Sequence, residues 1–135
     1  MVPFSHKQNI LLLYLIVLVP LGISSKLYTG PWHVVVSDKL AGSFYVIFWI
    51  ILFAMILTRY NFNKIILMVT LITCLLEFSQ LLKLDFLISI RATFIGRSLI
   101  GSSFSWTDFP FYFIGAGVAW LLLRTVKRRK IDTEL

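Results

Sequence analysis

The sequence has few charged residues and few of the side chains that build metal clusters or catalytic dyads. Charged residues make up 14% of the chain and hydrophobic residues 59%, whereas soluble domains average about 25% and about 45–50%. The one cysteine, Cys74, excludes an internal disulfide and a cysteine-based metal cluster. His6 and His33 are far apart and are not expected to ligate a metal. No Cys-His, HExxH or suitably placed Ser-His arrangement indicates a hydrolase.

Long apolar runs fill most of the chain. Four of them approach the roughly 17–25 residues needed to cross a hydrocarbon layer about 30 Å thick. We expect membrane spans at about residues 9–25, 38–58, 64–83 and 107–125, within a single integral membrane domain of residues 1–135. The predicted fold is therefore all-α, a polytopic membrane protein with four transmembrane helices and both termini on one side.

The connections between the spans differ in length. Thr58 to Lys64 is short, and Asn61 and Asn63 favour a tight turn, which predicts an antiparallel hairpin of spans two and three. Between spans three and four, residues 86–95 are apolar but too few to cross the membrane, so we predict an interfacial or re-entrant helix there. Residues 96–103, with two glycines and three serines, are predicted to form a compact loop.

The net charge of +7 is explained better by membrane topology than by nucleic-acid binding. Eight basic residues lie on the side of the termini: Lys7, Arg59, Lys64, Arg124, Lys127, Arg128, Arg129 and Lys130. The opposite side carries five: Lys26, Lys39, Lys83, Arg91 and Arg97. Because cytoplasmic loops are enriched in Lys and Arg, both termini are expected in the cytoplasm.

The most unusual feature is a carboxylate near the end of the third span. An acid inside the hydrocarbon boundary costs roughly 2.5–3.5 kcal/mol on insertion scales, so Glu77 needs partners that offset this cost. The residues Thr70, Thr73, Glu77 and Gln80 are spaced three, four and three apart, which places them on one helical stripe. The stripe is predicted to face inward.

Topology brings further polar residues to the same end of the molecule. Asp38 begins span two, and Asp108 begins span four, with Tyr112 following one turn later on the same face. The segment between spans three and four adds two arginines. Together these residues predict a polar pocket open to the outer leaflet, with the ligand-binding residues Asp38, Glu77, Gln80, Arg91, Arg97, Asp108 and Tyr112.

Each of these residues also has a simpler interpretation. Asp38 and Asp108 are equally well explained as acids that favour the positive end of a helix dipole. Arg91 is explained as the counterion that neutralises Glu77. The segment around Arg97 is a connector, or alternatively an anion-binding concavity in which backbone N–H groups and an arginine hold a phosphate.

The pattern of these motifs resembles the VanZ-like superfamily of small bacterial membrane proteins, and most closely a branch known only as a domain of unknown function. The resemblance runs from about residue 22 to 120 and rests on Gly22-Ile23-Ser24-Ser25-Lys26, Asp38, Glu77-Phe78-Ser79-Gln80-Leu81, Arg91, Gly96-Arg97, Gly101, Phe104-Ser105-Trp106-Thr107-Asp108, Tyr112 and Gly115. It implies a location in the bacterial inner membrane. VanZ itself is associated with teicoplanin resistance, but Gly42 and Ser43 stand here in the region where VanZ has a histidine.

Three functions follow as hypotheses. The first is binding of a lipid-linked or cell-envelope molecule in the outer polar pocket, with membrane lipids as further partners and no nucleic acid. The second is a membrane enzyme whose catalytic candidates are Glu77 and Asp108, acting without a cofactor or with a divalent cation shared by Asp38, Glu77 and Asp108. The third is a structural, oligomeric or channel-like component. We expect no dedicated metal site.

Overall fold

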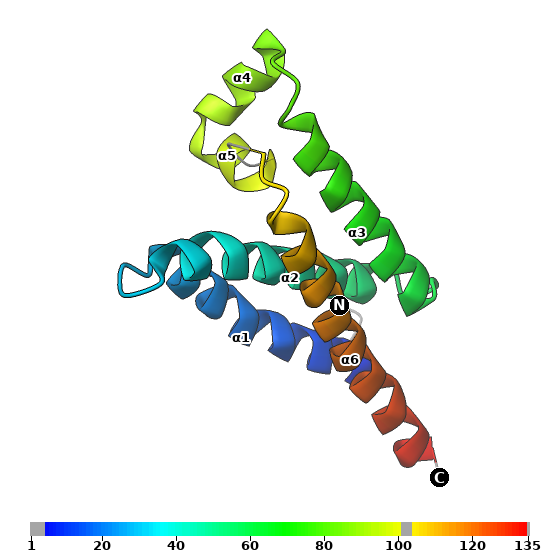
Figure 1. The fold of residues 1–135 in the computed structure, drawn as a ribbon. Helices are drawn as coiled ribbons and strands as arrows, with labels where there is room; N and C mark the ends of the chain where they lie inside the picture. Colours follow the sequence, from blue (N-terminus) through cyan, green and yellow to red (C-terminus); the bar gives the residue numbers. More distant parts are fainter. Residues whose placement is uncertain (1–4, 101–103, 135) are drawn as a thin grey trace.

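Four long helices run back and forth along the molecule, and two short helices cover one end of it (Figure 1). The computed structural model describes residues 5–100 and 104–134, with Ser98 and residues 128–134 described by their backbone alone. The long helices are α1 (His6–Leu27), η1 continued by α2 (Val35–Leu40 and Ala41–Ile56), α3 (Phe62–Ser79) and α6 (Asp108–Glu134). Each is long and apolar enough to cross a membrane, which confirms the four predicted helices.

Side chains in the sequence define where these helices begin. Ser5 precedes α1 and accepts a hydrogen bond from the backbone N–H of Gln8, whose side chain accepts one from Ser5 N–H in return. Asn61 precedes α3 and accepts from Asn63 N–H at 3.1 Å. The predicted tight turn between the second and third long helices is therefore confirmed, and Asn61 is the residue that caps the next helix.

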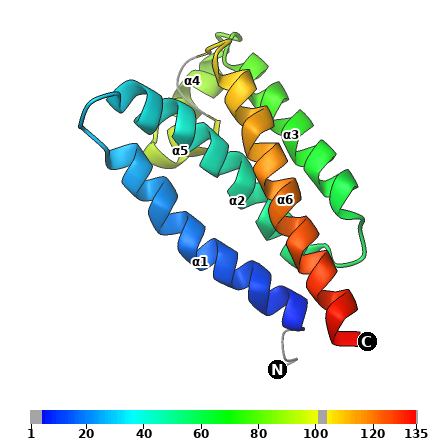
Figure 2. The same cartoon turned by 60° about the horizontal axis from the view of Figure 1, so that its bottom comes forward.

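Helices α2 and α6 form the centre of the bundle, with α1 on one side and α3 on the other (Figure 2). The α2–α6 approach is close because Gly115 has no side chain: a Cβ there would lie 2.7 Å from the carbonyl oxygen of Ser43. The start of α1 and the end of α6 lie at the same end of the bundle. The buried hydrophobic residues are Leu11, Leu15, Leu18, Val46, Ile47, Ile50, Ile51, Ala54, Ile65, Val69, Tyr112, Ala116, Ala119, Leu123 and Val126.

Helix α3 meets α2 near the Thr58–Lys64 turn and diverges from it toward the other end of the molecule (Figure 1). The inward stripe predicted for α3 is confirmed for Thr70, Thr73 and Glu77, all of which are buried. Gln80 is half-buried just past the helix end. The outer face of α3 is apolar and exposed at Leu67, Leu71 and Leu75, as expected for a surface in contact with lipid chains.

The segment between α3 and α6 contains the predicted short helix, but a second helix replaces the first part of the predicted loop. It forms two short helices, α4 (Asp85–Ala92) and α5 (Phe94–Ile100), so residues 96–100 are helical and not a loop. The break falls at Thr93, whose hydroxyl accepts a hydrogen bond from Gly96 N–H and so acts as a helix cap. Gly96 permits the close turn, since a Cβ there would lie 1.8 Å from the carbonyl oxygen of Ile90. The remainder of the predicted loop, residues 101–103, lies outside the described residues.

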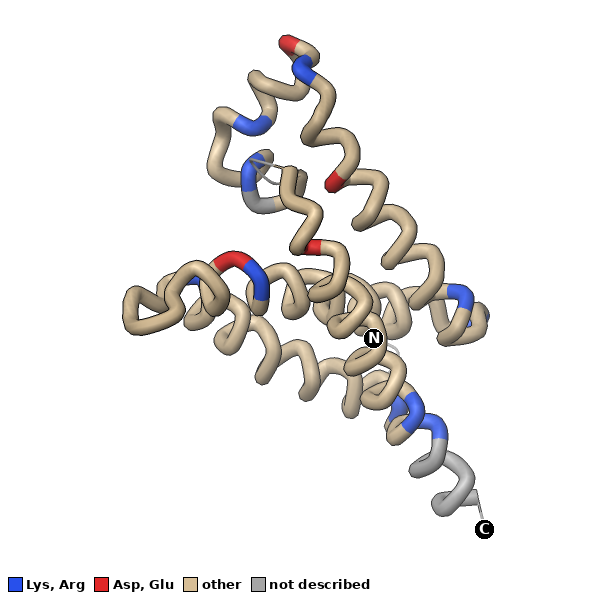
Figure 3. The backbone as a smooth tube through the Cα atoms, viewed as in Figure 1, with Lys and Arg blue, Asp and Glu red and all other residues tan. Residues whose placement is uncertain are grey.

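Charge is distributed unevenly along the bundle (Figure 3). Among the residues whose side chains are described, all four acids lie toward the end that carries α4 and α5: Asp38, Glu77, Asp85 and Asp108. At the opposite end, the charged side chains that are described, in the turn between α2 and α3 and near the end of α6, are all basic. The two ends of the molecule therefore present different chemistry to a membrane surface.

Candidate functional site

Glu77 lies at the centre of a buried hydrogen-bond network between α3, α6 and the segment that joins α5 to α6. Its side chain is 2% exposed. One carboxyl oxygen, Oε1, accepts from the backbone N–H of Ser105 at 2.9 Å. The other, Oε2, accepts from the Tyr112 hydroxyl at 2.6 Å and from Gln80 Nε2 at 3.2 Å. We call Glu77, Gln80, Ser105 and Tyr112 the Glu77 network.

The network supplies the hydrogen-bond donors that offset the free-energy cost of burying the Glu77 carboxylate. A buried polar group is tolerated when its hydrogen-bonding capacity is used, and Glu77 receives three donors. The predicted grouping of Glu77, Gln80 and Tyr112 is confirmed by these contacts. The Ser105 backbone N–H was not predicted, because a loop donor leaves no signal in the sequence.

Gln80 extends the network to α5. Its Nε2 atom donates to the carbonyl oxygen of Ile100 at 2.8 Å as well as to Glu77. On the other side, the hydroxyl of Tyr45 in α2 donates to the carbonyl oxygen of Leu99 at 2.8 Å. These carbonyls belong to the last turn of α5, where no intrahelical partner is available. Side chains from α2 and from the end of α3 thus hold the end of α5 between them.

An ion pair adjoins the network at the start of α6. Lys39 Nζ contacts Asp108 Oδ1 in a salt bridge and donates to Ser105 Oγ at 3.1 Å. The Lys39 and Asp108 side chains are 17% and 21% exposed, so the pair is largely shielded from solvent. Ser105 therefore connects the two groups, with its hydroxyl on Lys39 and its backbone N–H on Glu77.

Aromatic rings cover the network on the side of the α5–α6 connection. Phe78 of α3 packs against Phe104, Trp106 and Phe109, with ring centroids 6.0, 5.9 and 5.2 Å away. Phe109 also contacts Tyr112 edge-on at 6.2 Å. These rings lower the polarity around the Glu77 network, which strengthens its hydrogen bonds.

Asp38 does not belong to this site, contrary to the prediction. It is exposed and pairs with Lys26 at 3.5 Å, near the connection between α1 and η1. Its neighbour Lys39 reaches Asp108 in its place. Residues 35–40 form a wider, π-helical turn, so Asp38 and Lys39 point in other directions than they would in a regular α-helix.

Arg91 has a different partner from the one predicted. Arg91 Nη2 donates to the carbonyl oxygen of Ser79 at 2.8 Å, and the described residues contain no ion pair between Arg91 and Glu77. The interpretation of Arg91 as the counterion of Glu77 is therefore wrong. It satisfies a carbonyl in the last turn of α3 instead. Arg97 is exposed on α5.

The three acids named for a shared cation, Asp38, Glu77 and Asp108, have separate partners in the part of the chain that the structure describes. Asp38 pairs with Lys26, Asp108 pairs with Lys39, and both oxygens of Glu77 accept donors from the protein itself. No group of three histidine, cysteine or acidic residues with metal-binding geometry occurs in the part of the chain that the structure describes.

An apolar groove lies beside the network, in the space where α3 diverges from α2. It has a volume of about 310 Å³ and we call it the α2–α3 groove. Its walls come from α2 (Tyr45, Trp49, Phe53) and α3 (Val69, Ile72, Thr73, Leu76), and its end is closed by α5 (Leu99, Ile100). The one hydroxyl on its α3 wall, that of Thr73, already donates to the Val69 carbonyl oxygen. The groove thus offers a surface for hydrocarbon.

Comparison with known proteins places this architecture in a family. Residues 31–116 match the family described as "Protein of unknown function (DUF2809)". The chain belongs to the DUF2809 family. No curated protein and no solved structure matches it. The part of the chain matched to DUF2809 contains all of the Glu77 network, Lys39, Asp108 and every residue that lines the α2–α3 groove.

Chemically, the site combines a carboxylate that accepts hydrogen bonds from the protein at both oxygens with an apolar groove. A general base needs a lone pair directed at a substrate proton. Both carboxyl oxygens of Glu77 already accept hydrogen bonds from the protein, and Asp108 accepts from Lys39. This geometry suits a network that positions α5 and the start of α6 around the groove.

Proposed function

We propose that this protein binds a membrane lipid with a phosphate-bearing headgroup, whose hydrocarbon chain lies in the α2–α3 groove. The observation that carries the proposal is the groove itself, about 310 Å³ of apolar space between two membrane-spanning helices. Its volume lies at the lower end of the roughly 300–1,000 Å³ of ligand pockets. At this depth in a membrane, the molecules that can enter from the side are hydrocarbon chains.

Basic residues on α5 and in the connection that follows α3 support an anionic headgroup. Arg97 is exposed on α5, the helix that closes the groove with Leu99 and Ile100. Lys83 is exposed in the connection that follows α3. Arginine binds phosphate oxygens with two parallel hydrogen bonds, so a phosphate is the headgroup chemistry that fits best.

The Glu77 network supports binding rather than catalysis. It fixes the end of α5 through Gln80 and the start of α6 through Ser105 and Tyr112. A site built on a rigid support loses less conformational entropy when its ligand binds. In this proposal the buried acid maintains the shape of the site and the ligand contacts the groove and the arginine-bearing helix.

The cellular setting follows from charge and resemblance. The excess of basic residues on the side of the termini supports a cytoplasmic location for both termini, which puts the α4–α5 end at the outer leaflet. The resemblance to VanZ-like proteins supports the bacterial inner membrane and a ligand from the cell envelope. A lipid-linked envelope molecule with a phosphate would be present at the outer leaflet and would belong to the cell envelope.

Photo-crosslinking tests the proposal. The purified protein is mixed with phosphatidic acid that carries a diazirine in its acyl chain, and labelled residues are mapped by peptide mass spectrometry. Labelling is expected at Trp49, Phe53, Ile72 and Leu76, which line the groove. An excess of unlabelled phosphatidic acid should reduce labelling more than an excess of phosphatidylcholine.

A matched pair of variants on adjacent residues provides the control. Leu76→Trp fills the groove and should remove most of its labelling. Leu75→Trp makes the same change on the outer face of α3, where the side chain is 58% exposed, and should leave groove labelling intact. Equal labelling of the two variants, or labels concentrated on Leu67, Leu71 and Leu75, would exclude the groove as the binding site.

A further inference from the structure

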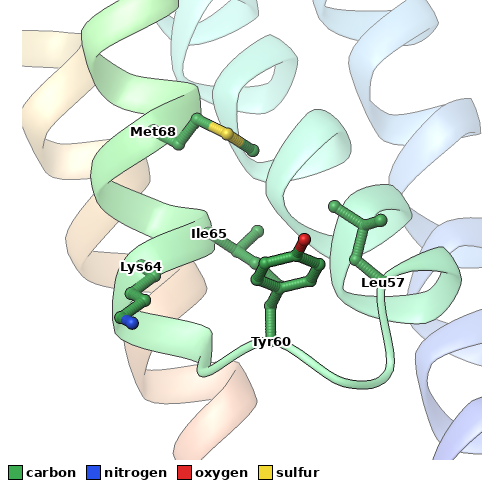
Figure 4. Close-up of a pocket in the computed structure, with 5 residues that line it drawn as sticks. All are labelled: Leu57, Tyr60, Lys64, Ile65 and Met68. Atoms are coloured by element: carbon green, nitrogen blue, oxygen red, sulfur yellow. The ribbon is translucent and has the colours of Figure 1, made fainter.

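We infer that a second lipid site, specific for an anionic phospholipid of the opposite leaflet, lies where α2 turns into α3. A cleft of about 210 Å³ opens there, lined by Leu57, Tyr60, Lys64, Ile65 and Met68 (Figure 4). We call it the basic-end cleft. It shares no lining residue with the α2–α3 groove and lies at the other end of α3.

The cleft has apolar side chains at one end and a basic side chain at the other, which matches the acyl chain and the headgroup of a lipid. Figure 4 shows the Tyr60 ring between Ile65 and Leu57, with Met68 extending toward α2 one turn of α3 further along. The Lys64 ammonium points away from Met68, toward the start of α3. An acyl chain is therefore accommodated near Ile65 and Met68, with its phosphate beside Lys64.

Charge identifies the headgroup as anionic. The turn between α2 and α3 carries Arg59 and Lys64 and no acid. In the part of the chain that the structure describes, both recorded ion pairs lie elsewhere, Lys26 with Asp38 and Lys39 with Asp108. Basic pockets between transmembrane helices on the cytoplasmic side bind phosphate headgroups for this reason.

Helices α1 and α6 add further positive charge at this end of the bundle. Lys7 of α1 lies 4.2 Å from the centre of the Phe62 ring, directly after the turn. The end of α6 adds Arg124, Lys127, Arg128, Arg129 and Lys130, against the two acids Asp132 and Glu134. The surrounding field therefore attracts anionic lipids, and the cleft selects where one of them binds.

Native mass spectrometry of the detergent-purified protein tests this site. The protein is titrated with phosphatidylglycerol or with phosphatidylcholine, and bound lipids are counted. Tighter binding of phosphatidylglycerol is expected. Lys64→Gln should weaken it about fivefold, because a basic residue near an anionic lipid is worth about 1 kcal/mol.

Two matched controls separate the cleft from general charge attraction. Lys127→Gln removes the same charge from the same end of the bundle but from α6, outside the cleft, and is expected to weaken binding less than twofold. Met68→Trp fills the cleft and should weaken binding, whereas Leu67→Trp, on a neighbouring side chain that is 70% exposed, should not.

The proposal is overturned if Lys64→Gln and Lys127→Gln weaken phosphatidylglycerol binding equally, or if the protein does not distinguish the two lipids. Because Lys64 is exposed, its substitution leaves the core intact, so this comparison decides the question even if Met68→Trp fails to fold. Leu76→Trp should leave binding at the basic-end cleft unchanged. The test of the basic-end cleft is therefore independent of the test of the function proposed for the α2–α3 groove.

Discussion

The hydroxyl of Tyr112 on α6 donates a 2.6 Å hydrogen bond to Glu77 on α3, and both side chains are buried. This contact joins two membrane-spanning helices that are 35 residues apart in sequence. The residues that follow α3 and precede α6 attach to the same carboxyl group, Gln80 through its amide and Ser105 through its backbone. One acid thus joins the end of α3 to the start of α6 and, through Gln80, to the end of α5.

The first prediction concerns that bond. Hydrogen bonds between membrane helices average about 0.6 kcal/mol and reach about 1.7 kcal/mol. Tyr112→Phe removes a short, buried one and should lower the free energy of unfolding by about 1.5 kcal/mol, at the upper end of that range. Tyr14→Phe removes an exposed bond to Thr125 and should cost no more than about 0.5 kcal/mol. Unfolding of both variants by denaturing detergent, followed by circular dichroism, measures the difference.

A second prediction uses the fact that Glu77 acts as an acceptor at both of its oxygens. Glu77→Gln replaces one oxygen with an NH₂ group, which then faces either Ser105 N–H or the donors Tyr112 and Gln80. A donor without an acceptor costs about 1–3 kcal/mol when buried, so Glu77→Gln should destabilise the protein by that amount despite its equal size. The thermal midpoint in detergent measures the effect. A variant as stable as the parent would show that the donors find other acceptors.

Arg91 provides a third prediction, because it contacts Ser79 and not Glu77. In a double-mutant cycle, Glu77→Gln and Arg91→Leu should show an interaction energy below about 0.5 kcal/mol, as expected for independent sites. The cycle of Glu77→Gln with Tyr112→Phe should show a coupling of about 0.5–3 kcal/mol, the range for residues in direct contact. The opposite ranking would restore Arg91 as the counterion of the buried acid.

Several features of the fold were predictable because each rests on a property of consecutive residues. Hydropathy and length identified the four membrane spans. Helical phase placed Thr70, Thr73 and Glu77 on the inward face of α3. The tight turn at Asn61 and Asn63 followed from the preference of asparagine for turns. Topology then brought Tyr112 to the same end of the bundle as Glu77, where the two meet.

The errors arose where contacts depend on local backbone shape. Asp38 and Lys39 are adjacent, and the π-helical turn decides that Lys39 reaches Asp108. The break at Thr93 had a signal, since threonine is a preferred helix-capping residue, but the apolar run around it obscured that signal. No sequence signal indicated the α2–α3 groove. The groove exists because two helices diverge, and the sequence alone does not define the angle between them.

The two ion pairs yield a fourth prediction from their different burial. Asp38→Asn breaks a pair whose side chains are 66% and 54% exposed, and should change the unfolding free energy by no more than about 0.5 kcal/mol. Asp108→Asn leaves the shielded Lys39 without its partner and should cost about 1–3 kcal/mol, less than the 3–5 kcal/mol of a fully buried pair. Melting of both variants at low and high salt checks this. Added salt should diminish the Asp38 effect and leave most of the Asp108 effect.

Two glycines on α6 provide the sharpest comparison, because they are two residues apart and differ only in what faces them. A Cβ on Gly115 would lie 2.7 Å from the Ser43 carbonyl oxygen and 3.1 Å from its Cα, both backbone atoms of α2. A Cβ on Gly117 would have nothing within 4 Å. Gly115→Ala should therefore push α6 away from α2, at a cost of about 1–3 kcal/mol, typical of overpacking.

Gly117→Ala should instead stabilise the protein by about 0.5–1 kcal/mol, since alanine loses less backbone entropy than glycine in a helix.

The separation of α6 from α2 in Gly115→Ala has a second consequence at Ser43, whose hydroxyl donates to the Phe111 carbonyl oxygen at 2.7 Å. Amide hydrogen exchange around residues 108–116 should accelerate in Gly115→Ala and stay unchanged in Gly117→Ala. If both variants melt at the same temperature, the close approach of α2 and α6 at Gly115 does not limit the size of the residue there.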